Sequence, residues 1–496
     1  MLRLSYFKCI MIFTCCCLFT LQITVAQPCF PGEITTAAYA TGGESDYIKD
    51  VLWLTWGSTN VSTHRYGRHN QQLTEGAASY ASIPVGGGKY LCLQATIENI
   101  QGRGGISSYA PGNWGGDYMD NLYNIGGDGA ANKLVNGIKN STAGQRVSFT
   151  IKCRATLDNL PVRIAGLVFG DAESLAVPEW FEATADGTWH IVELKKNLGA
   201  GDYKVEKTNI IEGSITKQKM AFISGNNSNT AAVSFLAFNQ SAYRPAEEGY
   251  EVSFDVVLQG NPQNPGITAI ALGIITLGAD GGDAPESYGA PIHILEGLAF
   301  TDDHIPPNGQ TVNLNTTSYE PGSLALPSSN FLGSTGPDAD NGTQYSQNAL
   351  ADDNNPNGPS NEEDAWPTAH KRWSYNATYK QGNTLNIDIP YNGLVNAHII
   401  GWIDFNWNGE FEESERATAE APASSDVATL TWTIPADRIA KSTYVRLRYA
   451  INKDEIESPT TVATGGEVED HFIYILGPAT TNPMLPSKVK QPTQSP

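Results

Sequence analysis

Residues 147–153 read Val-Ser-Phe-Thr-Ile-Lys-Cys, and residues 250–258 read Tyr-Glu-Val-Ser-Phe-Asp-Val-Val-Leu. Apolar and polar side chains alternate with a period of two in both runs, which indicates β-strands with one buried face. The run Tyr-Val-Arg-Leu-Arg-Tyr-Ala-Ile at 444–451 is of the same kind. Clusters of Gly, Asn, Asp and Pro separate such runs, and no long stretch has the period of an amphipathic helix. We therefore predict an all-β protein built from β-sandwich domains.

A change in composition divides the chain. No Lys or Arg occurs between Arg244 and Lys371, and acidic residues, Asn, Gly and Pro crowd residues 279–364 within this stretch. Such a segment is either a solvated linker or a set of turns with further oxygen ligands for calcium. We expect the following order: a jelly-roll or lectin-like sandwich at 27–278, an irregular acidic connector at 279–365, an Ig-like sandwich at 366–476 and a disordered polar tail at 477–496.

The first 26 residues have the pattern of a secretory signal peptide. Arg3 and Lys8 precede an apolar run at 9–25, and Ala26 provides the small residue of a cleavage site. We expect cleavage after Ala26, a secreted protein that is extracellular or held at the cell surface, and no membrane insertion after cleavage.

The charge balance excludes one class of partner. The chain has 52 acidic and 31 basic residues and a net charge of −21. Nucleic-acid binding depends on clustered Lys and Arg that neutralise phosphates, so we expect no nucleic-acid partner. Metal cations and neutral or basic partners are compatible with this charge.

Three cysteines follow the expected cleavage site, namely Cys29, Cys92 and Cys153. An oxidising compartment permits one disulfide among them and leaves one thiol over. Cys92 and Cys153 both lie in apolar, strand-like runs, where a buried thiol is as natural as a bridge.

The most specific chemical motif is the stretch Asp-Phe-Asn-Trp-Asn-Gly-Glu-Phe-Glu-Glu-Ser-Glu at 404–415. It matches the twelve-residue calcium-loop pattern at every specified position, with Gly409 at the sharp turn. The preceding run at 397–403 is strand-like, which favours a structural Ca²⁺ over a helix-loop-helix sensor. The alternative is an acidic turn that binds nothing. The expected ligands are Asp404, Asn406, Asn408, the carbonyl of Glu410, and Glu415.

Two stretches together resemble the GEVED domain of bacterial secreted and surface proteins. They are Gly-Trp-Ile-Asp-Phe-Asn-Trp-Asn-Gly-Glu-Phe at 401–411 and Gly-Glu-Val-Glu-Asp-His at 466–471. The resemblance covers residues 366–476 and implies a noncatalytic β-module. Within the second stretch, Glu467, Glu469 and Asp470 either complete the metal site or close a solvent-facing turn.

The N-terminal region resembles the nonrepetitive, lectin-like domain of CshA-type fibrillar adhesins. The resemblance is carried by Ile-Lys-Asp-Val-Leu-Trp-Leu-Thr-Trp-Gly at 48–57, Leu-Val-Phe-Gly-Asp-Ala-Glu-Ser at 167–174 and Ala-Thr-Ala-Asp-Gly-Thr-Trp at 183–189. It implies a domain that engages host or partner surface ligands.

The candidate ligand surface combines aromatic and acidic residues in Gly-rich loops, a mixture suited to sugar or protein recognition. The loop at 102–129 is the main candidate, and a second acidic pair follows the run that begins at Leu167. The candidate ligand-binding residues are Trp114, Asp117, Tyr118, Asp171 and Glu173.

We therefore predict a secreted surface or matrix adhesion protein with structural calcium, which recognises an extracellular glycan or a matrix or surface protein and is not an enzyme. The first alternative is a secreted polysaccharide-processing enzyme or its carbohydrate-binding accessory protein, since Asp171 and Glu173 could be read as a glycosidase pair. An acidic cleft would favour the enzyme, and a shallow aromatic face would favour binding. The second alternative is a structural spacer.

Overall fold

The computed structural model is almost entirely β, which confirms the predicted fold class. It describes residues 29–30, 37–58, 66–86, 88–112, 116–123, 134–157, 159–225, 229–246, 249–276, 278–295, 297–325, 330–340, 344–351 and 362–477. The expected signal peptide at 1–26 lies outside the described residues, as does all of the expected tail except Gly477. Helical structure in the described part is limited to α1 (Met119–Leu122), η1 (Gln240–Ala242), η2 (Glu286–Tyr288), η4 (Thr368–His370), η5 (Glu413–Glu415) and η6 (Lys453–Glu455).

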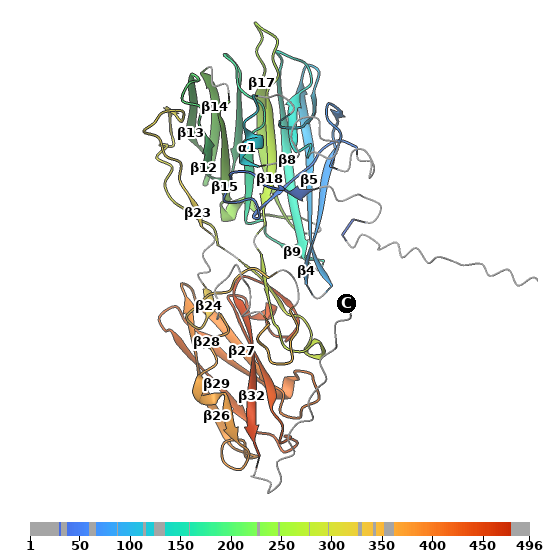
Figure 1. Ribbon diagram of the computed structural model, residues 1–496, viewed down its shortest axis with the longest axis vertical. Helices are drawn as coiled ribbons and strands as arrows, with labels where there is room; N and C mark the ends of the chain where they lie inside the picture. Colours follow the sequence, from blue (N-terminus) through green and yellow to red (C-terminus); the bar gives the residue numbers. More distant parts are fainter. Residues whose placement is uncertain are drawn as a thin grey trace, which may run out of the picture.

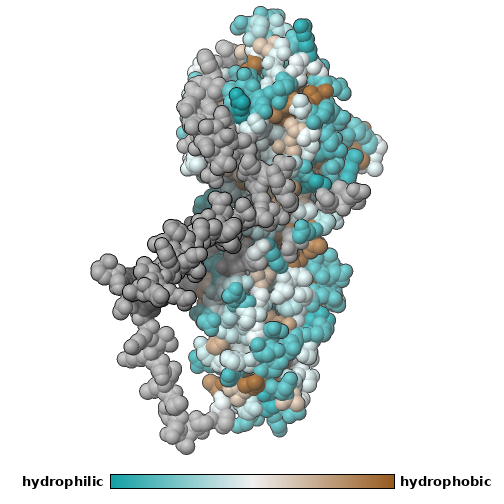
Figure 2. Space-filling view, turned by 90° about the vertical axis from the view of Figure 1, so that its right-hand side faces the viewer, coloured by the Kyte–Doolittle hydropathy of each residue, from teal (hydrophilic) through white to brown (hydrophobic). Residues whose placement is uncertain are grey.

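The strands form two lobes that follow one another along the long axis of the molecule (Figure 1). The N-terminal strands up to β18 make one lobe, and the strands from β24 onward make the other. Figure 2 shows a face on which hydrophilic residues predominate and apolar residues occur in small separate groups.

The first sheet of the N-terminal domain has the order β12-β15-β10-β18-β7-β6-β3, with β2 joined to β18 and β1 joined to β2. All of its pairings are antiparallel. Its strands are β1 (Ala38–Tyr39), β2 (Val51–Trp53), β3 (Gln72–Leu73), β6 (Ile106–Tyr109), β7 (Gly137–Asn140), β10 (Gly166–Asp171), β12 (Gly187–Lys195), β15 (Ala231–Phe238) and β18 (Ala269–Ile275).

The second sheet has the order β22-β13-β14-β11-β17-β8-β5-β4, with β16 beside β17 and β9 beside β8. Its strands are β4 (Ala78–Gly86), β5 (Lys89–Gly102), β8 (Arg146–Leu157), β9 (Leu160–Val162), β11 (Trp180–Ala185), β13 (Asp202–Glu212), β14 (Ile215–Gly225), β16 (Arg244–Ala246), β17 (Gly249–Gln259) and β22 (Asn308–Asn313). Along β8 the burial alternates residue by residue, as the period-two pattern predicts.

The core of this domain lies between the two sheets. Phe169 of the first sheet contacts Phe181 of the second, with ring centroids 5.6 Å apart, and Phe181 stacks on Phe222 at 4.7 Å. These rings belong to one cluster of buried side chains that also contains Cys153. The two sheets therefore form a β-sandwich.

A disulfide joins Cys29 to Cys92 on β5, with their Cα atoms 5.5 Å apart. Cys153 on β8 is the remaining thiol of the described residues, and it is buried. Burial raises the pKa of Cys153 to about 12. It is therefore a small core residue rather than a reactive thiol.

The C-terminal domain contains two further sheets, with the orders β24-β26-β29 and β25-β32-β30-β27-β28. Gly401 of β27 lies against the other sheet, because a Cβ atom there would come within 2.8 Å of both Leu430 and Trp432. This close approach explains a glycine within a strand. The strands are β24 (Asn330–Leu332), β25 (Arg372–Ser374), β26 (Thr384–Gly393), β27 (Ala397–Ile403), β28 (Arg416–Ala421), β29 (Val427–Thr433), β30 (Thr443–Ala450) and β32 (Glu467–Leu476).

The described parts of the acidic connector are divided between the two domains. β19 (Ala279–Gly281) pairs with β20 (Ile292–Ile294), which pairs in parallel with β31 (Val462–Thr464) of the C-terminal domain. The chain then returns to the N-terminal domain, where β21 (Ala299–Phe300) pairs with β23 (Leu324–Ala325) and β22 extends the second sheet beside β13.

Buried contacts hold this returning segment on the N-terminal domain. Asp303 forms an ion pair with Lys207, with 2.5 Å between Nζ and Oδ2, and accepts a hydrogen bond from the amide of Ile191. Phe300 stacks on His190 with ring centroids 4.2 Å apart. At β24 the chain reaches the C-terminal domain again, so the part of the chain that the structure describes passes between the two domains three times.

We predict that Cys153 does not react with a thiol reagent in the native protein. For the chain that begins at Gln27, labelling of the native protein should detect no thiol, and labelling in guanidinium chloride should detect one. Burial keeps the reagent away from the sulfur and keeps the thiol protonated, whereas the thiolate is the reactive form. Rapid labelling of the native protein would contradict this, and a Cys153→Ala variant should show no thiol in either condition.

Candidate cation and ligand sites

The calcium-pattern loop connects two neighbouring antiparallel strands, β27 and β28, and ends in the η5 turn. The loop therefore has a strand on each side, of which the sequence predicted the one that precedes it. Trp407 and Gly409 have φ values of 57° and 85°, so the chain turns sharply in the middle of the loop.

The two carboxylates at the ends of the loop, Asp404 and Glu415, are both buried. Asp404 Oδ2 accepts hydrogen bonds from the Tyr288 hydroxyl at 2.6 Å and the Gly409 amide at 3.1 Å. Glu415 accepts from the amides of Phe405 at 2.7 Å and Glu412 at 3.1 Å. Asp404 Oδ1 is buried and accepts no hydrogen bond.

The polar residues between them shape the turn. The side-chain oxygen of Asn406 accepts from the amide of Asn408, and that of Asn408 accepts from the amide of Glu410, both at 2.9 Å. Asn406 also donates to Glu412. Residues with side-chain oxygens thus recur at alternate positions of the loop, which is the spacing that the calcium pattern specifies.

The electrostatics of the loop fit a divalent cation. Burial raises the pKa of Glu415 to about 7, hydrogen bonds from Glu412 and Phe405 lower it, and the charge of Asp404 raises it again. Among the described residues, no ion pair with Lys, Arg or His involves Asp404 or Glu415. Two buried carboxylates, one with an oxygen that accepts no hydrogen bond, form a donor set that suits Ca²⁺.

Three of the candidate ligand residues of the N-terminal domain, Asp117, Asp171 and Glu173, lie near one another. Asp171 is the last residue of β10, and Asp117 directly precedes the Tyr118–Met119 start of α1. Burial raises the pKa of Glu173 to about 10, and the charges of Glu179, Asp117 and Asp171 raise it further. Asp117, Asp171 and Glu179 therefore all lie within electrostatic reach of Glu173.

Two tyrosines support this acidic cluster from within the domain. The Tyr109 hydroxyl donates to Asp117 and the Tyr203 hydroxyl donates to Asp171, both at 2.6 Å. Asp171 Oδ1 and Glu173 Oε2 are buried atoms with no hydrogen bond. Asp171 is 2% exposed, whereas Glu173 is half-buried, so Glu173 is the least buried member of the cluster.

The remaining candidate residues differ in their placement. Trp114 lies outside the described residues. Tyr118 is half-buried and packs against a hydrophobic cluster. Sequence reasoning missed Glu179, whose pKa burial raises to about 7, and Lys139, whose pKa burial lowers while Glu173 raises it. Neither residue lies in a motif, so no sequence signal identified them.

The acids of the second GEVED stretch lie neither in the calcium-pattern loop nor in a solvent-facing turn. Glu467, Glu469 and Asp470 are buried on β32. Each accepts a hydrogen bond from a backbone amide of the connector, donated by Leu332, Ala365 and Ala284 respectively.

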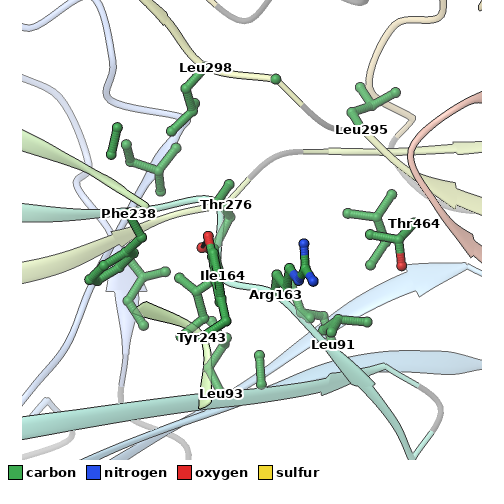
Figure 3. Close-up of a pocket in the computed structure, with 18 of the residues that line it drawn as sticks. Leu91, Leu93, Arg163, Ile164, Phe238, Tyr243, Thr276, Leu295, Leu298 and Thr464 are labelled. Atoms are coloured by element: carbon green, nitrogen blue, oxygen red, sulfur yellow. Dashed lines mark hydrogen bonds between the residues drawn. The ribbon is translucent and has the colours of Figure 1, made fainter. Parts of the chain in front are cut away.

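A cavity of about 280 Å³ lies where the lower end of the N-terminal sandwich meets β20 and β31 (Figure 3). Leu91, Ile164, Phe238 and Leu298 give it an apolar lining, and Arg163 and Tyr243 add polar groups. Its described lining contains no Asp, Glu or His, so this cavity does not supply a pair of carboxylates.

Comparison with known proteins confirms the two resemblances and their order. Residues 49–275 match the family described as surface adhesin CshA non-repetitive domain 2, and residues 398–474 match the GEVED domain. These matches support a surface adhesion or binding protein. None of the helices in the described part of the chain is long and apolar enough to cross a membrane.

Solved structures that align with the chain include that of the N-terminal domain of the Streptococcus gordonii adhesin Sgo0707. The alignment covers 82% of this chain and 81% of that chain at 6% identity, and its TM-score of 0.28 is too low to carry an argument. No curated protein matches the chain.

We predict that Ca²⁺ stabilises the C-terminal domain. Calcium should raise the melting temperature of the chain that begins at Gln27, since an ion at a hundredfold excess over its Kd adds about 2.7 kcal/mol to the free energy of unfolding. Asp404→Asn should remove most of the shift, and Asp426→Asn, an exposed acid of the same domain, should retain it. An equal shift in both variants, or none in the parent, would contradict the site.

The pKa of Glu415 predicts a pH dependence without calcium. Because its folded-state pKa of about 7 lies above the ordinary 4.5, the native state holds more protons in that window, and the free energy of unfolding falls as pH rises through it. Urea denaturation in EGTA should show this loss for the parent relative to Glu415→Gln, which cannot titrate. Calcium should remove the loss by competing with the proton, and equal slopes for both proteins would refute the assignment.

Proposed function

We propose that this protein is a secreted cell-surface or matrix adhesion protein whose N-terminal domain binds an extracellular glycan or protein ligand, and whose C-terminal domain is stabilised by calcium. The observation that carries the proposal is the convergence of Asp117, Asp171, Glu173 and Glu179 at the end of β10, within the region that matches a surface-adhesin domain.

The chemistry of this cluster suits a ligand rich in hydrogen-bonding groups. Glu173 is partly accessible, and its raised pKa keeps it protonated at neutral pH, so it offers both a donor and an acceptor. Asp171 and Tyr203 lie behind it in a fixed arrangement. Hydroxyl groups of a sugar, or amides and basic groups of a protein, are the matching partners.

Calcium has a structural role in this proposal. The loop from Asp404 to Glu415 joins two strands of the C-terminal domain, and Tyr288 of the connector donates a hydrogen bond to its first carboxylate. An ion held there would stabilise both the hairpin and the position of the connector against it. Extracellular modules commonly use weak calcium sites, because calcium is abundant outside cells.

We expect the ligand to be found by glycan-array and immobilised-matrix-protein binding with the calcium-loaded chain that begins at Gln27. Glu173→Leu removes the hydrogen bonds of this carboxyl group to the ligand, which contribute about 1.4 kcal/mol or more to the binding free energy. It should therefore weaken binding roughly tenfold. Glu173→Gln, which keeps a donor and an acceptor, should weaken it less. Glu212→Leu, a matched change at an exposed acid of β13, should bind as the parent does.

Binding that is insensitive to Glu173→Leu would place the ligand surface elsewhere.

A second candidate function, a polysaccharide-processing enzyme, is favoured by the two neighbouring carboxyls Glu173 and Glu179, whose pKa values are raised to about 10 and about 7. An enzyme would release new reducing ends from a bound polysaccharide, and Glu179→Gln should abolish that release. This result would replace the proposed binding function with a catalytic one.

A further inference from the structure

The second GEVED stretch places three polar side chains on one face of β32. Glu467, Glu469 and His471 are spaced two apart on this strand, so they point to the same side. All three are buried. Asp470 points the other way and forms an ion pair with Arg446 at 2.7 Å, so that pair does not supply a cation to the first face.

The connector adds a fourth group to this face. Glu363 is 4% exposed, and its Oε2 lies 3.9 Å from His471 Nε2. His471 Nε2 lies 2.8 Å from Glu469 Oε2. One ligand atom from each of Glu363, Glu469 and His471 lies within 4.8 Å of both others, a separation that a single metal ion can span.

A second observation points to a missing positive charge. Glu467 Oε1 is buried and accepts no hydrogen bond, while its Oε2 accepts from the amide of Leu332. Glu467 and its neighbour on the same face, Glu469, are 1% and 0% exposed. Burying several carboxylates together costs free energy unless a cation or protons neutralise them.

We propose that Glu363, Glu469 and His471 bind a first-row divalent metal ion, with Zn²⁺ as the reference ion, where the connector meets β32. The imidazole decides between metals, because calcium takes oxygen ligands, whereas zinc binds histidine nitrogen together with carboxylate oxygen. Three protein ligands leave one position of a tetrahedral site for water or a further carboxylate. The site is separate from the calcium-pattern loop and does not depend on the ligand of the N-terminal domain.

Such an ion would fasten the connector to the C-terminal sheet. Glu363 lies two residues before Ala365, whose amide donates to Glu469 at 2.9 Å. Next in the chain is Trp366, whose ring centroid lies 6.1 Å from that of His471. Metal binding at Glu363 would therefore hold the same stretch that these contacts already position.

The test is zinc titration of the chain that begins at Gln27, by calorimetry and by metal analysis after dialysis, in millimolar calcium so that the loop at 404–415 does not compete. We expect one saturable zinc equivalent and a higher melting temperature. His471→Gln and Glu363→Gln should each weaken zinc binding at least tenfold. His398→Gln and Glu420→Gln, matched changes at a histidine and an acid elsewhere in the domain, should not.

Cobalt(II) gives a readout that depends on the ligands themselves. Its visible absorption should report a site with nitrogen and oxygen ligands and should disappear in His471→Gln. If His471→Gln shows no cooperative unfolding, Glu363→Gln decides the result, because its side chain lies on the connector. The absence of saturable zinc binding in the parent, or unchanged binding in Glu363→Gln, would overturn the proposal and leave protonation as the means by which these carboxylates are neutralised.

Discussion

The buried ion pair between Arg446 and Asp470 is the interaction on which the arrangement of the connector depends. Both side chains are fully buried. The guanidinium reaches Asp470 through two nitrogens and also donates to the carbonyls of Tyr288 and Pro459. A buried arginine is stable only when its donors are satisfied, and Tyr288 belongs to the connector. The C-terminal sheet therefore needs the connector to complete its own interior.

The same requirement applies to the neighbouring acids. Asp280 of the connector accepts from the amide of Val468, while Glu469 accepts from the amide of Ala365. A carboxylate of the connector thus accepts from an amide of β32, and a carboxylate of β32 accepts from an amide of the connector. This reciprocity explains why an acidic segment without a hydrophobic pattern is ordered where it meets β32, and why the acids of the second GEVED stretch are buried.

The sequence predicted the features that depend on neighbours in the chain. Alternation at 147–153 predicted β8 and its buried face, and the strand-like run at 397–403 predicted β27, which leads into the loop at 404–415. Features that depend on distant partners could not be predicted. Asp280 and Val468 are 188 residues apart, and Asp303 and Lys207 are 96 apart. No local pattern indicates that an acid in a Gly-rich segment is matched by a partner on another domain.

The three passages of the chain between the domains have a consequence for how the two are held together. A single break between β20 and β21 would leave β19 and β20 on the N-terminal fragment, bound beside β31 of the other domain. The C-terminal fragment would begin with β21, β22 and β23, bound to the N-terminal domain. Each fragment would then carry strands that are bound to the domain of the other fragment. Continuity of the peptide chain is therefore not the only bond between them, and a nicked molecule would stay in one piece.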